Sequence, residues 1–383
     1  MSQVPFYEVN EAIVAMGGED LNLCMQCGLC SGSCPWRLVD GEFFVRQMIR
    51  MGQLGLEGYE SDDILYGCTT CGLCPQRCPR GVKIIDVMRA MRSMIAEAGA
   101  IPGVLKTVLG SVHGKGNPWS EEREKRIRWT QGLDIPSFQE GTEYFLSICC
   151  TSAYDVRSQK IAKALAGILT KAGVSYGILG NEESCCGESV RKIGDEILFA
   201  KLVEKNSQLL EGKGVKKLIV NSPHCLYTYT KEYPQMGAEF ETSHHSQILA
   251  SLIESGAIKP EKAIEKKIAF HDPCYLGRHS DIYDAPRSII EAIPGAELVE
   301  LKRNRRNSLC CGAGGGRLWM ETAPEQRFSD LRIHEALESG AQILATACPY
   351  CINMLEDSRK NTGKEDEIEV LDISELLGAS IGI

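Results

Sequence analysis

The sequence lacks several features that would assign it to large classes of proteins. No apolar run is long enough to span a bilayer, and residues 1–20 have neither the basic start nor the apolar core of a signal peptide. The net charge of −9 argues against nucleic acid as a partner. The glycine run at 314–316 does not follow the G-x-G-x-x-G spacing, and we find no flavin or nicotinamide fingerprint elsewhere. We therefore expect a globular, cytoplasmic protein of two or three domains that carries no flavin of its own.

Cysteine is the residue type that the sequence has in excess. Its 18 cysteines fall into a group of eight before residue 80, a group of five between 149 and 225, and a group of five between 274 and 351. Their spacing is typical of metal ligands in a reducing compartment and not of disulfides. We take this partition as the domain map, with an N-terminal region at 1–98, a connector at 99–142, a first module at 143–260 and a second module at 261–383.

The first group contains the most specific pattern in the chain, and the pattern occurs twice. Each copy has the spacing C-x-x-C-x-x-C-x-x-x-C-P, which holds [4Fe–4S] clusters, and in paired runs the fourth cysteine serves the other cluster. The predicted ligand sets are Cys24, Cys27, Cys30 with Cys78, and Cys68, Cys71, Cys74 with Cys34. Apolar residues recur at helical spacing around the runs. The region is similar to the α-helical ferredoxin domains of fumarate reductase-type iron–sulfur subunits.

The pattern changes at residue 143, where short apolar strands begin to alternate with amphipathic helices. Strands are expected at 144–148, 174–179 and 217–220, and again at 267–270, 297–301 and 342–346. This repeat indicates an internal duplication of about 120 residues, each half a βαβ-type unit with a parallel sheet. The predicted class is therefore α+β multidomain, with a helical ferredoxin-like domain followed by two α/β modules. In the connector, we interpret the mixed-charge run at 121–129 as a solvated helix.

The second module has five cysteines on three predicted loops. They are Cys274, Cys310, Cys311, Cys348 and Cys351. A disulfide between adjacent cysteines is strained, and zinc normally takes paired thiolates at C-x2-C spacing. Adjacent thiolates fit better where several metal atoms need ligands, and five sulfurs exceed the four that an ordinary cubane takes. Gly312 after the adjacent pair, and Gly187 at the matching place in the first module, would let the backbone approach such a group closely.

The first module departs from this pattern at two places. Ser222 stands where the second module has Cys348, and the adjacent Cys149 and Cys150 stand where it has Cys274 alone. The spacing does not decide between these two cysteines. The candidate ligands are Cys150, Cys185, Cys186 and Cys225, with Cys149 in reserve. Four thiolates fit a conventional [4Fe–4S] cluster, and a remnant without metal is the alternative that the sequence leaves open.

Paired ferredoxin runs followed by duplicated cysteine modules resemble the iron–sulfur subunits of heterodisulfide reductases, most closely the D-type subunit that fuses both parts in one chain. The resemblance covers residues 20–375, and in the second module it is carried by 270–279, 308–317 and 347–351. The residues after Cys150 also resemble the family pattern, which favours Cys150 over Cys149. Glycolate oxidase iron–sulfur subunits, anaerobic glycerol-3-phosphate dehydrogenase C subunits and an electron-transfer subunit of class II benzoyl-CoA reductase complexes use the same architecture.

The resemblance implies that the five cysteines of the second module bind a non-cubane [4Fe–4S] assembly that reacts directly with a disulfide. The chain would then be an oxidoreductase subunit that receives electrons from a flavin-, haem- or quinone-linked partner through two [4Fe–4S] clusters. For His271 beside Cys274 we expect either a donor role toward the site or a structural hydrogen-bonding role, and Arg317 would attract an anionic thiol substrate or an acidic partner. The alternative is a pure electron-transfer subunit of a larger anaerobic complex, and attachment to a membrane through a partner subunit stays open.

Overall fold

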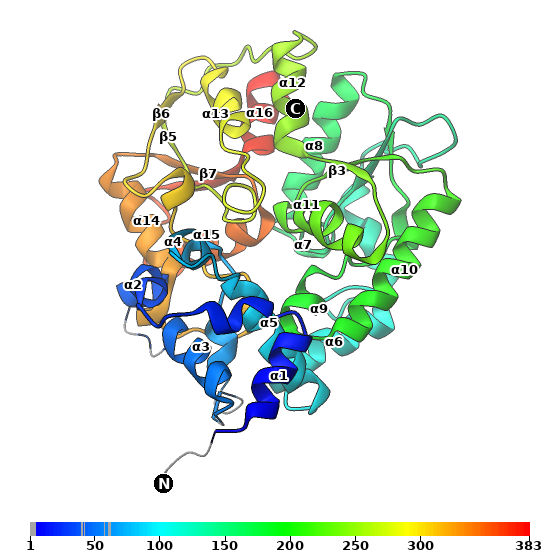
Figure 1. Ribbon diagram of the computed structural model, residues 1–383. Coiled ribbons are helices and arrows are strands. Elements are labelled where there is room, and N and C mark those ends of the chain that lie inside the picture. The colour runs from blue at the N-terminus through cyan, green and yellow to red at the C-terminus, as the bar shows by residue number, and fades with distance from the viewer. Residues whose placement is uncertain (1–4, 40, 42, 57, 60–62) are drawn as a thin grey trace. The chain divides into compact units, whose positions relative to one another are not determined.

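The computed structural model of the protein describes residues 5–39, 41, 43–56, 58–59 and 63–383 (Figure 1). The chain divides into two compact units whose segments alternate along the sequence. The ferredoxin unit comprises the chain up to Gly110 together with Glu188–Phe199 and Gly312–Phe328. The module unit comprises Ser111–Gly187, Ala200–Cys311 and Ser329–Ile383. Both short segments of the ferredoxin unit therefore start where a Cys-Cys-Gly motif ends.

The ferredoxin unit is helical, and none of its described residues lies in a strand. Its helices are α1 (Tyr7–Ala15), α2 (Leu29–Ser33), α3 (Val45–Leu54), α4 (Leu73–Arg77), α5 (Ile84–Glu97), the first part of α6 (Gly103–Lys115) and α9 (Glu188–Ile193). Apolar residues recur every three or four positions on α5, and Val87 and Met91 on this face are fully buried. Helix α5 packs against α1 and α3, where Ile13 and Met48 are also fully buried. Burial of each such side chain contributes about 1.5–3 kcal/mol.

Each module contains a four-stranded sheet in which every pairing is parallel. The order of the first sheet is β2-β1-β3-β4, with β1 at Tyr144–Ser147, β2 at Tyr176–Gly177, β3 at Lys217–Val220 and β4 at Glu241–His244. The order of the second is β6-β5-β7-β8, with β5 at Lys267–Phe270, β6 at Glu297–Val299, β7 at Ile343–Thr346 and β8 at Glu369–Asp372. The predicted fold class is confirmed. The fourth strand of each sheet was not predicted, and β2 is shorter than expected.

The helices of the modules follow the order expected for βαβ units. The first module has α7 (Cys150–Tyr154), α8 (Gln159–Lys171), α10 (Glu196–Gly212), α11 (Pro223–Tyr227) and α12 (His245–Glu254). The second has α13 (Asp284–Glu291), α14 (Phe328–Glu338), α15 (Pro349–Asn361) and α16 (Ile373–Ile381). Within the module unit the two modules contact each other, because Arg157 forms ion pairs with Glu356 and Glu375, both at 2.9 Å. The modules therefore pack directly against each other.

The sheet registers show which cysteines of the two modules are equivalent. Phe145 lies opposite Leu218 in the first sheet, and Ala269 lies opposite Leu344 in the second. Ser222 stands four residues after Leu218, as Cys348 does after Leu344. Cys150 stands five residues after Phe145, as Cys274 does after Ala269. The register therefore makes Cys150, and not Cys149, the counterpart of Cys274.

The mixed-charge run of the connector is helical, as interpreted, but two of its side chains are buried and not solvated. Residues Arg123–Thr130 form a 3₁₀ helix in which Arg126 and Trp129 are buried. The Arg126 guanidinium reaches the first module, where Nη2 donates to the carbonyl of Ile148 at 2.7 Å. This part of the connector therefore covers the first module.

Candidate metal centres

The five cysteines of the second module all follow strands of its sheet. Cys274 follows β5, Cys310 and Cys311 follow β6, and Cys348 and Cys351 lie at the end of β7 and in the first turn of α15. All five are buried, with exposed fractions between 0 and 6%. The sulfurs of Cys311 and Cys351 are 3.4 Å apart. Since the carboxyl ends of parallel strands meet at one edge of a sheet, cysteines distant in sequence converge there.

His271, which directly follows β5, also lies at this site. One of its ring nitrogens and the sulfurs of Cys311 and Cys351 lie within 4.8 Å of one another. Nδ1 accepts a hydrogen bond from Nε of Arg332 at 3.1 Å, so the ring proton is on Nε2. Burial lowers the pKa of His271 well below its usual range, and Arg332 lowers it further. His271 is thus a neutral donor, and its Nε2 has no hydrogen-bond partner among the described residues.

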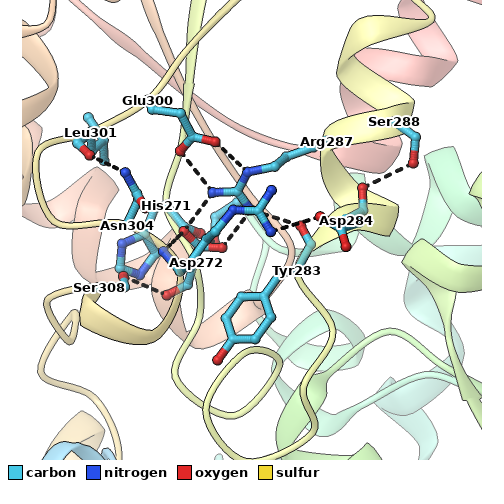
Figure 2. Close-up of polar contacts among 12 residues, drawn as sticks. His271, Asp272, Tyr283, Asp284, Arg287, Ser288, Glu300, Leu301, Asn304 and Ser308 are labelled. Carbon is cyan, nitrogen blue, oxygen red and sulfur yellow. Dashed lines mark hydrogen bonds and ion pairs between the residues drawn. The ribbon is translucent and has the colours of Figure 1, made fainter.

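Asp272, the neighbour of His271, has a structural role (Figure 2). Its two carboxylate oxygens accept hydrogen bonds from Arg287 at 2.8 and 2.9 Å, and the backbone N–H of Arg305 donates to it at 2.7 Å. Arg287 also pairs with Glu300, and Ser308 donates to the carbonyl of Asp272 at 2.9 Å. This network fixes the loop before Cys310 to the loop before Cys274.

The first module contributes a side chain to the second module's site. The His224 ring stacks on Tyr275 with a centroid distance of 4.0 Å and lies 4.5 Å from the Tyr350 ring. Burial alone would raise the pKa of Cys348, but hydrogen bonds with Cys351 and His224 outweigh burial and bring the pKa to about 5. Burial raises the pKa of Cys351, and the neighbouring Cys311 and Cys348 sulfurs raise it further. Sequence reasoning missed His224, although it occupies the position that Tyr350 has in the second module.

The cysteines of the first module form a comparable group. Cys150 and Cys185 are in hydrogen-bond contact, and the sulfurs of Cys186 and Cys225 are 3.6 Å apart. The N–H of Gly187 donates to the Cys185 sulfur at 3.4 Å. Cys149 has another environment, because it caps α7 by accepting from the Ser152 N–H at 3.5 Å. The structure thus brings together the four cysteines predicted as ligands.

A buried ion pair closes this group on the connector side. Arg126 Nη1 lies 3.6 Å from the Cys150 sulfur, and Nη2 contacts Glu183 Oε2 at 2.7 Å. Burial raises the pKa of Glu183 although Arg126 opposes that shift. Burial would lower the pKa of Arg126, but Glu183 and Cys150 together raise it well above its usual value. Arg126 is therefore a fixed positive charge beside a candidate ligand, and sequence reasoning missed it.

In the ferredoxin unit, cysteines of the two runs lie near one another. Cys24, Cys27, Cys30 and Cys78 line one pocket. Burial raises the pKa of Cys74 well above its usual range, and the nearby Cys68, Cys71 and Cys34 raise it further. The two runs repeat the same backbone conformation, because Gln26 and Thr70 both have positive φ, as do Gly28 and Gly72. The first three cysteines of each run are therefore held by the same turn of the backbone.

Other predicted residues have these places. Gly187 and Gly312 have φ of 91° and 102°, which glycine adopts without strain. Arg317 belongs to the ferredoxin unit, where its guanidinium lies 5.5 Å from the Trp36 ring and donates to Thr322 Oγ1 at 2.6 Å. Burial lowers the pKa of Arg317. Its action on an anionic substrate stays a prediction.

The donor sets fit iron–sulfur clusters. In the two modules all the thiols are buried, with sulfurs as close as 3.4 Å, whereas in the ferredoxin unit Cys27 is exposed and Cys24, Cys34 and Cys78 are half-buried. The second module's site also has an N–H donor that lacks a partner among the described residues. Sulfur ligands of this number suit iron–sulfur groups, and N–H donors to sulfur are a known means of setting their potentials.

Comparison with known proteins agrees with this assignment. The 4Fe-4S dicluster domain family matches residues 20–82, and the cysteine-rich domain family matches residues 144–229 and 268–356. The D-type subunit of the dihydromethanophenazine:CoB–CoM heterodisulfide reductase from Methanosarcina barkeri is 30% identical over 400 aligned positions, which cover 95% of each chain. The chain belongs to the family of D-type heterodisulfide reductase subunits. It thus has a ferredoxin-like region followed by two cysteine-rich modules.

Other relatives of this family member are longer proteins. The probable iron–sulfur-binding oxidoreductase FadF from Bacillus subtilis is 37% identical over 84% of this chain and 47% of its own length. The EtfAB:quinone oxidoreductase from Syntrophomonas wolfei is 34% identical over 82% of this chain and 46% of its own length. The chain spans about half the length of these two relatives. In the part of the chain that the structure describes, no helix is long and apolar enough to cross a membrane.

Proposed function

We propose that this chain is the iron–sulfur subunit of a heterodisulfide reductase-like complex and that its second module is the site of disulfide reduction. Electrons would come from a partner subunit linked to flavin, haem or quinone. Two [4Fe–4S] clusters would be held by Cys24, Cys27, Cys30 and Cys78 and by Cys68, Cys71, Cys74 and Cys34, and a non-cubane cluster by the five cysteines of the second module. The observations that carry the proposal are the burial of all five thiols and the grouping of three of them, with a 3.4 Å sulfur–sulfur contact between Cys311 and Cys351 and with Cys348 beside Cys351.

The net reaction at the second module would convert one disulfide into two thiols with two electrons and two protons. A bound iron–sulfur cluster supplies electrons one at a time. The chain's own residues would supply ligation and hydrogen bonding. The five cysteines bind as thiolates, and His271 Nε2–H is oriented by Arg332 as a donor to sulfur. His224 stacks on Tyr275 and forms a hydrogen bond with Cys348, so it is a second imidazole beside the ligands.

For the first module we propose a further [4Fe–4S] cluster held by Cys150, Cys185, Cys186 and Cys225. The strand register supports Cys150 as the ligand. Cys149 has a different role, because its sulfur caps α7. Arg126 supports a functioning site because a remnant would not require a buried cation 3.6 Å from a thiol. The proposed complex is cytoplasmic, with any membrane attachment through partner subunits.

A second candidate function is electron transfer between a flavoprotein and a quinone without disulfide chemistry. Two observations favour it. The identities to FadF and to the EtfAB:quinone oxidoreductase, 37% and 34%, are higher than the 30% to the M. barkeri protein. Ser222, which is buried, replaces the cysteine that would complete the first module.

Electron paramagnetic resonance of anaerobically purified, oxidised protein would separate the two functions. The spectrum is recorded with and without a small organic thiol, in the wild type, in Cys311→Ala and in the control Cys149→Ala. Disulfide chemistry predicts a signal in the oxidised protein that depends on the thiol, is lost in Cys311→Ala and persists in Cys149→Ala. Cubane signals that appear only after reduction and ignore the thiol would refute disulfide reduction and favour the second candidate.

A further inference from the structure

Arg92 on α5 is a charged side chain that is only 1% exposed within the ferredoxin unit. Its Nη2 donates to the carbonyl oxygens of Leu65 at 3.0 Å and Cys68 at 2.8 Å. Its Nη1 donates to the carbonyl oxygens of Lys192 at 2.7 Å and Gly315 at 3.0 Å. One guanidinium therefore joins three stretches of chain that are far apart in the sequence.

The acceptors on Nη1 follow the Cys-Cys-Gly motifs of the two modules. Lys192 stands six residues after Cys186, and Gly315 stands four residues after Cys311. Their segments, Glu188–Phe199 and Gly312–Phe328, are the two parts of the modules that belong to the ferredoxin unit. The acceptors on Nη2 belong to the start of the second ferredoxin run. Arg92 thus holds one segment from each module at the loop that carries Cys68.

Glycines at the same place show independently that these segments approach the Cys68 loop closely. A Cβ atom on Gly314 would lie 2.2 Å from the carbonyl oxygen of Thr69, and one on Gly315 would lie 2.3 Å from that of Cys68. On the side of the first module, a Cβ atom on Gly194 would lie 2.5 Å from the carbonyl of Arg92. Only glycine permits such contacts between backbones. The glycine run at 314–316 therefore has a packing function in this unit.

We infer that Arg92 is a positioning residue that seats both segments on the Cys68 loop and places a fixed positive charge beside the cluster proposed for Cys68, Cys71, Cys74 and Cys34. The inference rests on the proposed function, because it requires that cluster. A nearby positive charge favours the reduced form, which carries one more negative charge, so Arg92 raises the midpoint potential of this cluster. Electrons that enter the ferredoxin unit would then reside mainly on this cluster, at the loop that contacts the segments 188–199 and 312–328.

The test is a redox titration of the full-length, cluster-loaded protein, followed by electron paramagnetic resonance. Arg92→Met should shift the reduction equilibrium of one cubane at least tenfold toward the oxidised form, about 59 mV for one electron, and leave the other unchanged. Arg92→Lys keeps the positive charge but cannot form all four hydrogen bonds, so the midpoint potential of this cluster should lie close to the wild-type value. Hydrogen exchange in 188–199 and 312–328 should be faster in both variants. The control Arg89→Met, on the same helix but facing Asp86 and Glu196, should change the equilibrium by less than twofold.

A pair of glycine variants tests the seating without altering charge. Gly315 and Gly99 both have φ of 67°, but a Cβ atom on Gly99 would meet nothing within 4 Å. Gly315→Ala should accelerate hydrogen exchange in 312–328, whereas Gly99→Ala should not. If Arg92→Met does not bind its clusters, the test relies on Arg92→Lys and Gly315→Ala. Hydrogen-exchange rates equal to those of the wild type in both variants would overturn the inference.

The possible failures are distinguishable. Wild-type protein without two cubane signals would refute the proposed clusters themselves. Two wild-type signals whose potentials are unchanged in Arg92→Met, or shift equally in Arg89→Met, would refute only the role of Arg92.

Discussion

Replacing Arg126 with methionine tests whether the connector closes the first module's site. The Arg126 and Glu183 side chains are 5% and 7% exposed and contact each other at 2.7 Å. Arg126→Met would leave the Glu183 carboxylate buried without its cation. Breaking a buried ion pair in this way costs about 3–5 kcal/mol, so we expect the free energy of unfolding to fall by about that amount.

Chemical denaturation of the cluster-loaded protein under argon measures this loss, from the shift in midpoint at a common slope. The matched control is Lys213→Met. Lys213 contacts Glu182, the neighbour of Glu183, at 2.8 Å, but the two side chains are 40% and 52% exposed. An exposed pair of this kind contributes about 0–1 kcal/mol. The double variant Arg126→Met/Glu183→Leu removes both buried charges and should regain most of the loss.

Two results would contradict this reasoning. One is a loss in Arg126→Met no larger than the loss in Lys213→Met, which would mean that the buried pair is not needed. The other is a double variant whose loss equals the sum of the two single losses, because additive losses would show that the two charges do not interact.

Two further predictions concern the modules. Burial raises the pKa of Glu375 and Arg157 opposes that shift, so in Arg157→Met the pKa should rise further. A carboxyl group whose pKa is raised by folding destabilises the folded protein as the pH rises through that pKa. The loss of stability in Arg157→Met relative to wild type, measured from denaturation midpoints, should therefore be larger at pH 8 than at pH 5. An equal loss at both pH values would refute the role of Arg157 at Glu375. If the first module holds a cluster, Cys225→Ser should lower the iron content by about four atoms per chain, whereas Cys149→Ser should not; unchanged iron in Cys225→Ser would identify a metal-free remnant.

The sequence was sufficient to predict the two parallel sheets. The strands at 217–220 and 267–270 are short, largely apolar runs that lead into the loops of Cys225 and Cys274, and the structure has strands at those positions. The fourth strands were missed because Glu241–His244 and Glu369–Asp372 contain polar residues and have no apolar run. Helix α15 was missed because its first residue, Pro349, lies inside the Cys-x-x-Cys spacing, which suggests a loop. Proline is in fact well suited to the first turn of a helix.

The residues that surround the sites left no signal in the sequence. Arg126 stands in a mixed-charge run, and arginine is mostly exposed in proteins, so solvent was the reasonable expectation. Its burial depends on Glu183 and Cys150, which are 57 and 24 positions away. His224 reaches Tyr275 only because the two modules pack together. Such roles arise from tertiary packing, which periodicity and motif spacing do not record.

The interleaved segments of the ferredoxin unit also bear on how the protein is made. Gly315 lies 223 positions after Arg92, and both are needed to complete the unit. At a synthesis rate of about 5–20 residues per second, the ribosome would deliver Gly315 roughly 10–45 s after Arg92. During that interval the Cys68 loop lacks its final cover. The cluster proposed for this loop would have that interval for its insertion, before the chain's own later residues close the loop.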